Sequence, residues 1–294
     1  MSVIECEKLC RDYGTRRGVI DIDLQIGRGR IFGFLGPNGA GKSTTIRLLL
    51  GFLRAGSGVA RIFNQDCWSD SHAIKQQVGY VPGDVRLYPW MTPRRAFSIV
   101  SRIHGRDLHS AGEQLAERFR LETDLPVRKM SRGNRQKVSL VLSMIHEPQL
   151  LVLDEPTSGL DPLMQDELAS CLREYAGDGR TIFFSSHTLS EVEDLCQEVA
   201  IVRDGRIVAN ESIQHMQARA PRIVRIVFAE RTNVAAIAWP DFLTLKSHSE
   251  QQSVLQMTGP ARQLVQWAAT QPVHDLEISP PSLDALFRNF YTTD

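Results

Sequence analysis

The feature that most constrains this chain is a glycine-rich run, Gly36-Pro37-Asn38-Gly39-Ala40-Gly41-Lys42-Ser43-Thr44. It fits the pattern of a glycine, four residues and then Gly-Lys-Ser/Thr, which cradles phosphate. Residues 30–35 are typical of a buried strand, and residues 45–50 are typical of a helix. Glycines allow the sharp turn that aims successive N–H groups inward, and the helix N-terminus adds partial positive charge. The run therefore predicts an anion-binding loop between a strand and a helix.

Three side chains in or near this loop have expected roles. Lys42 is expected to reach the β- and γ-phosphates of a nucleotide, and the Ser43 hydroxyl to ligate Mg²⁺. Tyr13 lies in the polar link 11–15. It is a candidate to stack on an adenine ring, because stacking gives binding energy with little demand on hydrogen bonding. An ordinary loop tyrosine is the alternative.

A second candidate for chemistry is the segment 150–155, Leu-Leu-Val-Leu-Asp-Glu. Four apolar residues followed by two carboxylates predict a strand that is buried on both faces and delivers acids at its C-terminal edge, where α/β sheets bind ligands. We expect Asp154 to hold the hydration shell of Mg²⁺ and Glu155 to orient and deprotonate the attacking water. His187 follows another apolar run, 180–185, and is a candidate γ-phosphate contact, although an isolated histidine there is more often a cap or a surface residue.

Bulk properties exclude several classes of protein. The 294 residues contain 34 Lys and Arg and 34 Asp and Glu, so no surplus of positive charge favours a nucleic-acid partner. The five cysteines are scattered without a Cys-x-x-Cys pair, which favours a reduced cytosolic chain. The N-terminus has no basic-then-apolar leader, so we expect no secretion. The apolar runs are far shorter than the roughly 20 residues needed to cross a bilayer, so any membrane span must come from another chain.

The pattern of apolar and polar residues changes near residue 221. Residues 222–228, 253–257 and 273–278 alternate like strands, whereas residues 261–270 and 282–291 have helical spacing. We therefore predict a small α+β accessory domain over residues 221–294. Upstream of it, residues 92–121 also have helical spacing, and Asp204-Gly205 predicts a hairpin turn.

Taken in order, these motifs resemble the nucleotide-binding subunit of ATP-binding cassette (ABC) transporters over about residues 2–215. The resemblance rests on the phosphate loop, the acids at 154 and 155, His187, and two further segments: Met130-Ser131-Arg132-Gly133-Asn134-Arg135-Gln136-Lys137 and Ser158-Gly159-Leu160-Asp161. It implies an α/β fold with a P-loop NTPase core of the ABC type, made of a mixed sheet with flanking helices, an antiparallel β subdomain and a helical subdomain at about 84–140. The ATP-binding domain would span residues 1–220.

The resemblance also implies a paired active site. In this family two subunits pair head to tail, so Ser131, Gly133 and Asn134 would face the γ-phosphate held by the other subunit, and Asp161 would also belong to the nucleotide site. Physically this presents a helix N-terminus to an anion. ATP and Mg²⁺ are the cofactors implied, and a second nucleotide-binding subunit is the first partner. A homodimer is expected, with a heterodimer left open.

Two departures from the family pattern matter. The signature commonly reads Leu-Ser-Gly-Gly-Gln, and here Met130, Arg132 and Asn134 replace its first, third and fifth residues. We expect function to survive this, because Arg132 adds a cation where phosphate charge arrives and Asn134 keeps an amide. At the position where the family commonly carries a glutamine that links Mg²⁺ and water to the membrane partner, this chain has Gly83 followed by Asp84. Either Asp84 substitutes, or coupling relies on backbone movement.

The function implied is ATP hydrolysis that drives a transporter from the cytoplasmic face of a membrane. The motif style is most similar to ABC-2 type exporter ATPases, whose permeases are separate polypeptides. One alternative is a soluble ATPase of the same superfamily, although those usually carry two cassettes, coiled-coil insertions or zinc cysteines. Another is a regulatory subunit that binds ATP without hydrolysis; Gly83 keeps it open, whereas Asp154, Glu155 and His187 argue against it. The substrate is not revealed, since its contacts would belong to the membrane chain.

Overall fold

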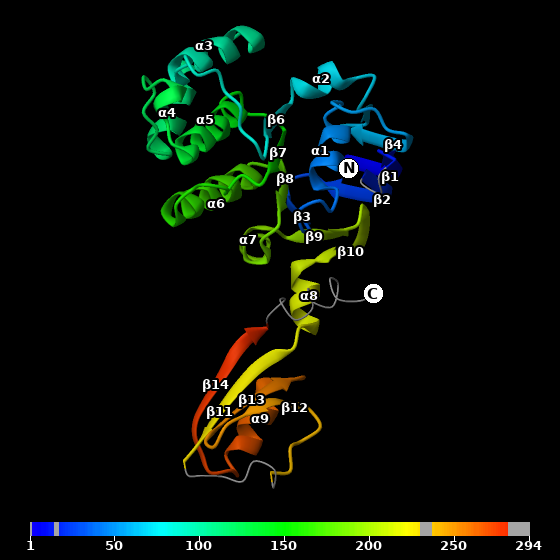
Figure 1. Ribbon diagram of the computed structural model, residues 1–294, viewed down its shortest axis with the longest axis vertical. Coiled ribbons are helices and arrows are strands. Elements are labelled where there is room, and N and C mark those ends of the chain that lie inside the picture. Colours follow the sequence, from blue (N-terminus) through cyan, green and yellow to red (C-terminus); the bar gives the residue numbers. More distant parts are fainter. Residues whose placement is uncertain (1, 15–17, 230–236, 282–294) are drawn as a thin grey trace. The chain divides into compact units, whose positions relative to one another are not determined.

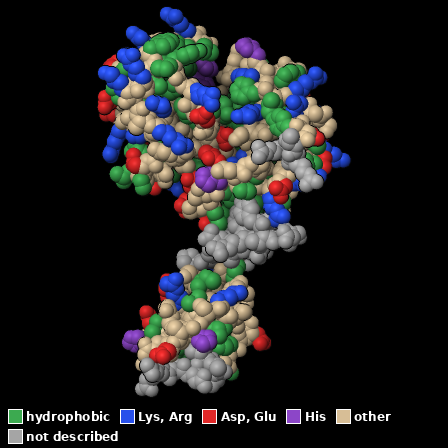
Figure 2. Space-filling view, viewed as in Figure 1, with side chains coloured by type: hydrophobic (Ala, Val, Ile, Leu, Met, Phe, Trp, Pro, Cys, Tyr) green, Lys and Arg blue, Asp and Glu red, His purple; other side chains and the backbone are tan. Residues whose placement is uncertain are grey.

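The computed structural model describes residues 2–14, 18–229 and 237–281. Two compact units make up the chain, Met1–Ile213 and Gln214–Asp294 (Figure 1). The domain boundary expected between residues 220 and 221 stays a prediction. Both acidic and basic side chains appear on the visible face (Figure 2), in line with their equal numbers in the sequence. Within the described residues, no helix has the length and apolar character needed to cross a bilayer.

The core of the first unit is a six-stranded sheet in the order β10-β9-β3-β8-β7-β6. Its strands are β3 (Ile31–Leu35), β6 (Val78–Val81), β7 (Leu150–Asp154), β8 (Thr181–Ser186), β9 (Glu198–Arg203) and β10 (Arg206–Ser212). All neighbours are parallel except β9 and β10. Every residue of β3, β7 and β8 is buried, which explains why these strands are continuous apolar runs rather than alternating ones.

Helices cover both faces of this sheet. Figure 1 shows α1 (Lys42–Leu49) on one side and α6 (Pro162–Gly177) on the other, with α7 (Leu189–Leu195) near α6. At the edge of the sheet, β9 turns into β10 through Asp204 and Gly205, both with positive φ. The structure therefore confirms the predicted hairpin, whose two-residue turn matches the twist of the strands.

Two further layers complete the first unit. A four-stranded sheet in the order β2-β1-β4-β5 contains β1 (Ser2–Asp12), β2 (Gly18–Gly27), β4 (Ser57–Ile62) and β5 (Gln65–Asp66). A helical region contains α3 (Pro93–His104), α4 (His109–Arg118), the 3₁₀ turn η1 (Val127–Lys129) and α5 (Arg132–Met144), whereas the short α2 (Ser71–Lys75) precedes β6. The fold class expected from the sequence is confirmed.

The helical stretch predicted over 92–121 consists of two helices. Thr92 caps α3 by accepting a hydrogen bond from the Arg95 N–H, and Gly105, with φ of 64°, ends it. Only glycine adopts that left-handed conformation at little cost, which is why α3 stops there. Arg118 at the end of α4 pairs with Glu167 and Glu174 of α6, joining the helical region to the core.

The second unit is an antiparallel sheet with helices. It contains α8 (Ile213–Arg219), β11 (Arg222–Phe228), β12 (Leu243–His248), β13 (Gln252–Met257), α9 (Ala261–Ala268) and β14 (Val273–Pro281). The strand order is β12-β13-β11-β14, the order of a split β-α-β arrangement. Strand β12 was not predicted, and β14 runs three residues beyond the expected strand 273–278. The helix predicted over 282–291 lies outside the described residues.

An aromatic stack inside the main sheet provides a stability test. The ring of Phe183 on β8 lies with its centroid 6.2 Å from Phe32 and 5.1 Å from Phe34, and all three side chains are fully buried. We expect Phe183→Ala to lower the free energy of unfolding of the first unit by about 3–5 kcal/mol, because removal of a fully buried ring leaves a cavity. The exposed Leu163 is the control, and its replacement by Ala should cost about 0.5 kcal/mol or less. Equal midpoints of urea unfolding for the two variants would contradict this assignment.

Candidate functional site

The glycine-rich run forms the loop between β3 and α1. Gly39 and Gly41 have φ of 85° and 109°, which L side chains rarely adopt. A Cβ at Gly36 would lie 2.4 Å from the Val202 carbonyl oxygen, so that approach also requires glycine. The Ala40 N–H closes a turn on the Pro37 carbonyl at 3.1 Å. These three glycine positions explain why the loop is rich in glycine, and the loop leads directly into the N-terminus of α1.

Lys42 turns back over its own loop. Its side chain is only 5% exposed, and Nζ donates to the carbonyl oxygens of Gly36 at 2.7 Å and Pro37 at 3.2 Å. The same Nζ lies 3.4 Å from Glu155 Oε1. A buried ammonium is tolerated only with such partners. The lysine therefore joins the loop to the end of β7.

Asp154 and Glu155 lie at the carboxyl end of β7. Asp154 is buried and accepts hydrogen bonds from Ser43 Oγ at 2.8 Å and Ser185 Oγ at 2.6 Å. Oxygen ligands of this kind suit Mg²⁺, so Ser43 and Asp154 fit the metal role expected of them. Burial and the nearby Asp154 carboxylate raise the pKa of Tyr80 to about 12, so that the phenol stays protonated.

Glu155 has a strained backbone. Its φ of 50° is in the left-handed region, which a non-glycine residue adopts at a cost of about 1–3 kcal/mol and which is most common at active sites. Its N–H donates to the Ser185 carbonyl at 3.1 Å. His187 Nδ1, at the end of β8, lies 3.3 Å from Glu155 Oε1. Glu155 is therefore held between Lys42 and His187, the two other residues with predicted catalytic roles.

Lys42, Ser43 and Glu155 line a hollow of about 380 Å³, whereas Asp154 and His187 are not among its described lining residues. Residues of the phosphate loop line this hollow together with Tyr13 and Glu155. Gly18 and Arg47 also line it, and neither residue was predicted from the sequence. Tyr13 is 42% exposed, and the guanidinium carbon of Arg11 lies 5.4 Å from the centroid of its ring. The structure thus brings Tyr13 to the same hollow as the phosphate loop. Arg47 follows the loop by one helical turn, a spacing that could have selected it.

The predicted signature residues lie elsewhere. Ser131 caps α5, with its Oγ accepting a hydrogen bond from the Asn134 N–H at 3.2 Å. Gly133 packs on the loop 156–161, where a Cβ would lie 2.5 Å from the Gly159 carbonyl oxygen. Asp161 in that loop caps α6 by accepting from the Met164 N–H at 3.1 Å. Ser131, Gly133, Asn134 and Asp161 are absent from the described residues that line the hollow around Lys42.

Gly83 lies beside the metal-site carboxylate. A Cβ at this position would be 3.4 Å from Asp154 Oδ2, which is an ordinary contact distance. The backbone of Gly83 therefore lies next to the Asp154 carboxylate, although the residue has no side chain. Asp84 is not engaged there: its side chain is 75% exposed, and its carboxylate lies 2.8 Å from Arg86 Nε. In this conformation the side chain of Asp84 pairs with its own loop.

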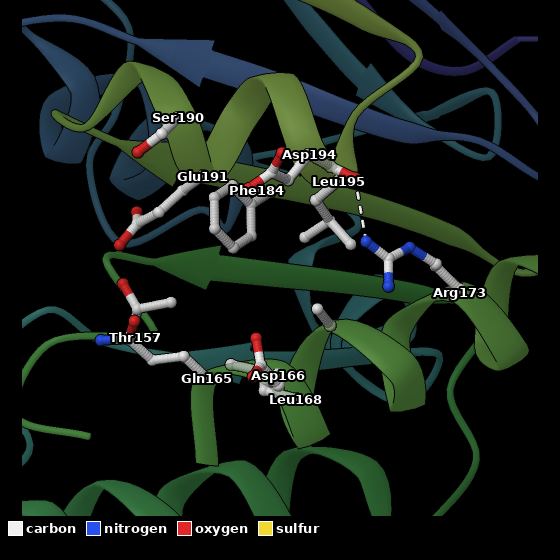
Figure 3. A pocket seen from close by; sticks show the side chains of 11 residues that line it. Thr157, Gln165, Asp166, Leu168, Arg173, Phe184, Ser190, Glu191, Asp194 and Leu195 are labelled. Carbon is white, nitrogen blue, oxygen red and sulfur yellow. Dashed lines mark hydrogen bonds between the residues drawn. The ribbon is translucent and has the colours of Figure 1, made fainter. Parts of the chain in front are cut away.

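A second hollow of about 460 Å³ lies between α6 and α7. Figure 3 shows Glu191 and Asp194 of α7 facing Gln165 and Asp166 of α6, with Arg173 donating to the Asp194 carbonyl at 3.0 Å. Glu191 accepts a hydrogen bond from Ser186 Oγ at 2.5 Å. None of the site residues predicted from the sequence lines this hollow.

Tyr13 supplies a direct test of the nucleotide site. If its ring stacks on the base, Tyr13→Ala should weaken ATP binding by about 1–3 kcal/mol, whereas Tyr13→Phe should retain the affinity. Titration of the full chain with a fluorescent ATP analogue measures both variants. If Tyr13→Ala binds ATP with the affinity of the wild type, Tyr13 is an ordinary loop tyrosine and does not stack on the base.

Comparison with known proteins gives a consistent result. The family model described as "ABC transporter" matches residues 19–158. Over 239 residues the chain is 32% identical to the bacitracin transport ATP-binding protein BcrA of Bacillus licheniformis, covering 80% of this chain and 78% of that protein. It is 35% identical over 212 residues to the Nod factor export ATP-binding protein I of Ralstonia nicotianae, covering 70% and 66%. A solved structure of an ATP-binding subunit of an ABC transporter superposes with a TM-score of 0.68 at 27% identity, covering 73% of this chain and 92% of that one.

Proposed function

This chain belongs to the ATP-binding proteins of ABC transporters, and we propose that it powers export through a separate membrane-spanning partner. Membership of the family makes it an ATPase. Export is supported by relatives whose names specify bacitracin transport and Nod factor export. As the subunit that powers a transporter, the chain would work at the inner face of the cell membrane.

The observation that carries the proposal is the cluster of Lys42, Ser43, Asp154, Glu155 and His187 at the carboxyl ends of β3, β7 and β8. Ser43 and Asp154 would hold Mg²⁺, which when bound neutralises charge on the β- and γ-phosphates. Lys42 would exchange its loop carbonyls for phosphate oxygens. Glu155 would accept a proton from the attacking water, and His187 would contact the γ-phosphate. Catalysis then comes mainly from positioning and charge stabilisation.

We also propose that each active site is completed by a second copy of the chain. The N-terminus of α5 packs on the loop 156–161 and does not contribute to the described lining of the hollow around Lys42. Ser131 is exposed at this N-terminus, and Gly133 and Asn134 are partly exposed, so a nucleotide bound by another subunit could reach them. A helix N-terminus favours an anion there because its first N–H groups have no carbonyl partners within the helix, and that of Asn134 is capped by Ser131 Oγ. ATP binding would close the pair, and hydrolysis would open it.

Docking of the permease is supported by exposed apolar side chains in the helical region. Tyr88 and Trp90 are 64% and 56% exposed and stack with centroids 5.7 Å apart. On the following helix α3, Ile103 is 73% exposed. Exposed apolar groups that adjoin one another, as the rings of Tyr88 and Trp90 do, are typical of a contact surface. In a transporter, we expect a cytoplasmic segment of the membrane partner to bind these exposed side chains.

Glu155→Gln tests the catalytic assignment. The amide keeps the size of the carboxylate but cannot accept the proton, so we expect ATP-driven dimerisation to persist while turnover falls by at least about 100-fold. Steady-state phosphate release and size-exclusion chromatography at saturating Mg·ATP measure the two properties. Glu122→Gln, at an exposed position, is the matched control. Rapid hydrolysis by Glu155→Gln would contradict the role of Glu155, and a persistent monomer would contradict the two-subunit mechanism.

A second variant tests the docking surface. We expect Trp90→Ala to reduce the amount of tagged chain recovered with native membranes by about tenfold or more, since interface aromatic residues commonly contribute ~2 kcal/mol or more. Its basal ATPase turnover should be unchanged. Trp68→Ala removes an equally large exposed ring outside the helical region and should leave membrane recovery intact. Equal recovery of the two variants would place the permease contact elsewhere.

A further inference from the structure

The first turns of α5 hold the loop 156–161 at several points. The buried amide of Gln136 donates to the Pro156 carbonyl at 2.9 Å. Gly133 lies so close to the Gly159 carbonyl oxygen that only a glycine can occupy its position. Arg132 makes the third connection. The loop that follows Glu155 is therefore fixed by the helix that carries the signature residues.

Arg132 is engaged within its own chain. Its Nη2 donates to Ser158 Oγ at 2.7 Å, a charge-assisted hydrogen bond. Its aliphatic stem runs along Gly159, where a Cβ would lie 3.3 Å from Arg132 Cγ. The sequence suggested that this cation meets the phosphate charge of the other subunit. In the structure the guanidinium is instead used to bind the loop.

Ser158 connects this contact to the catalytic residue. The Ser158 N–H donates a hydrogen bond to the Glu155 carbonyl at 3.2 Å. Ser158 therefore binds Arg132 through its side chain and Glu155 through its backbone. Glu155 has the left-handed φ of 50°, a conformation that persists only when its surroundings enforce it. Loss of the contact at Ser158 would relax the turn that begins at Glu155.

We infer that Arg132 is a positioning residue for hydrolysis, which holds Glu155 in its strained conformation through Ser158. The inference rests on the role of Glu155 proposed above. It explains why an arginine is compatible with a signature position where the family commonly has glycine: the side chain lies across the neighbouring loop rather than into the nucleotide-facing end of the helix. It also predicts that Arg132 affects the rate of the chemical step and not the binding of ATP.

A double-mutant cycle on the full-length chain tests this inference. Arg132→Met and Ser158→Ala should each lower kcat by about tenfold, the usual effect of losing one hydrogen bond to a charged group, with the KM for ATP changed by about twofold or less. The double variant should be no slower than Arg132→Met, because both substitutions remove the same contact. Ser158→Thr keeps the hydroxyl group and should retain kcat. ATP hydrolysis by the wild-type chain tests the proposed function by itself. If the wild type hydrolyses ATP but the variants do not behave as described, only the inference about Arg132 fails.

A direct contact between Arg132 and the partner's nucleotide gives a different result. Arg132→Met would then raise the KM for ATP, and its effect would persist in full in the Ser158→Ala background, so that the two losses multiply. Either outcome would overturn the inference. Arg128→Met removes an exposed cation four residues earlier and controls for general charge effects. Thermal unfolding midpoints equal to that of the wild type show that each variant has folded.

Discussion

The buried ammonium of Lys42 is the constraint on which the rest of the site depends. Moving such a charge out of water costs several kcal/mol unless polar groups surround it. Two carbonyl oxygens of its own loop and one carboxylate oxygen of Glu155 meet this need. The loop must therefore curl around the lysine, and glycines at 36, 39 and 41 are the residues that allow it. The same charge lies beside Glu155 at the end of β7, so this one side chain joins the phosphate-binding and catalytic elements.

Strand order explains why residues far apart in the sequence meet here. Strands β3, β8 and β7 are neighbours and parallel, so the loops that follow them emerge at one edge of the sheet. Asp154 pairs in register with Ser185, which places that hydroxyl on its carboxylate. Ligand sites in α/β sheets commonly form at such an edge. The chemistry then needs only a suitable residue after each strand: the loop lysine, the two acids and the histidine.

Local patterns in the sequence predicted the parts of the site that depend on local structure. The phosphate loop has a specific spacing, and four apolar residues before Asp154 indicate a buried strand that ends at the acids. Contacts that depend on strand register or on the packing of a helix against a loop could not be predicted from local patterns. Examples are the hydrogen bond from the Ser185 hydroxyl to the Asp154 carboxylate and the hydrogen bond from the Arg132 guanidinium to the Ser158 hydroxyl. Strand β12 was missed because its exposed end, residues 246–248, lacks the apolar alternation by which strands are recognised.

The position of β3 in the sheet also affects how a new copy of the chain matures. Strand β3 lies between β8 and β9, and 145 residues separate Leu35 from the start of β8 at Thr181. At translation rates of about 5–20 residues per second, this strand waits roughly 7–30 s for its first neighbour in the sheet. During that interval β3 lacks both of its partner strands, although Phe32 and Phe34 belong to a core cluster shared with β1, β2 and α1. The contacts that join Lys42, Glu155 and His187 can form only after residue 187 has been synthesised.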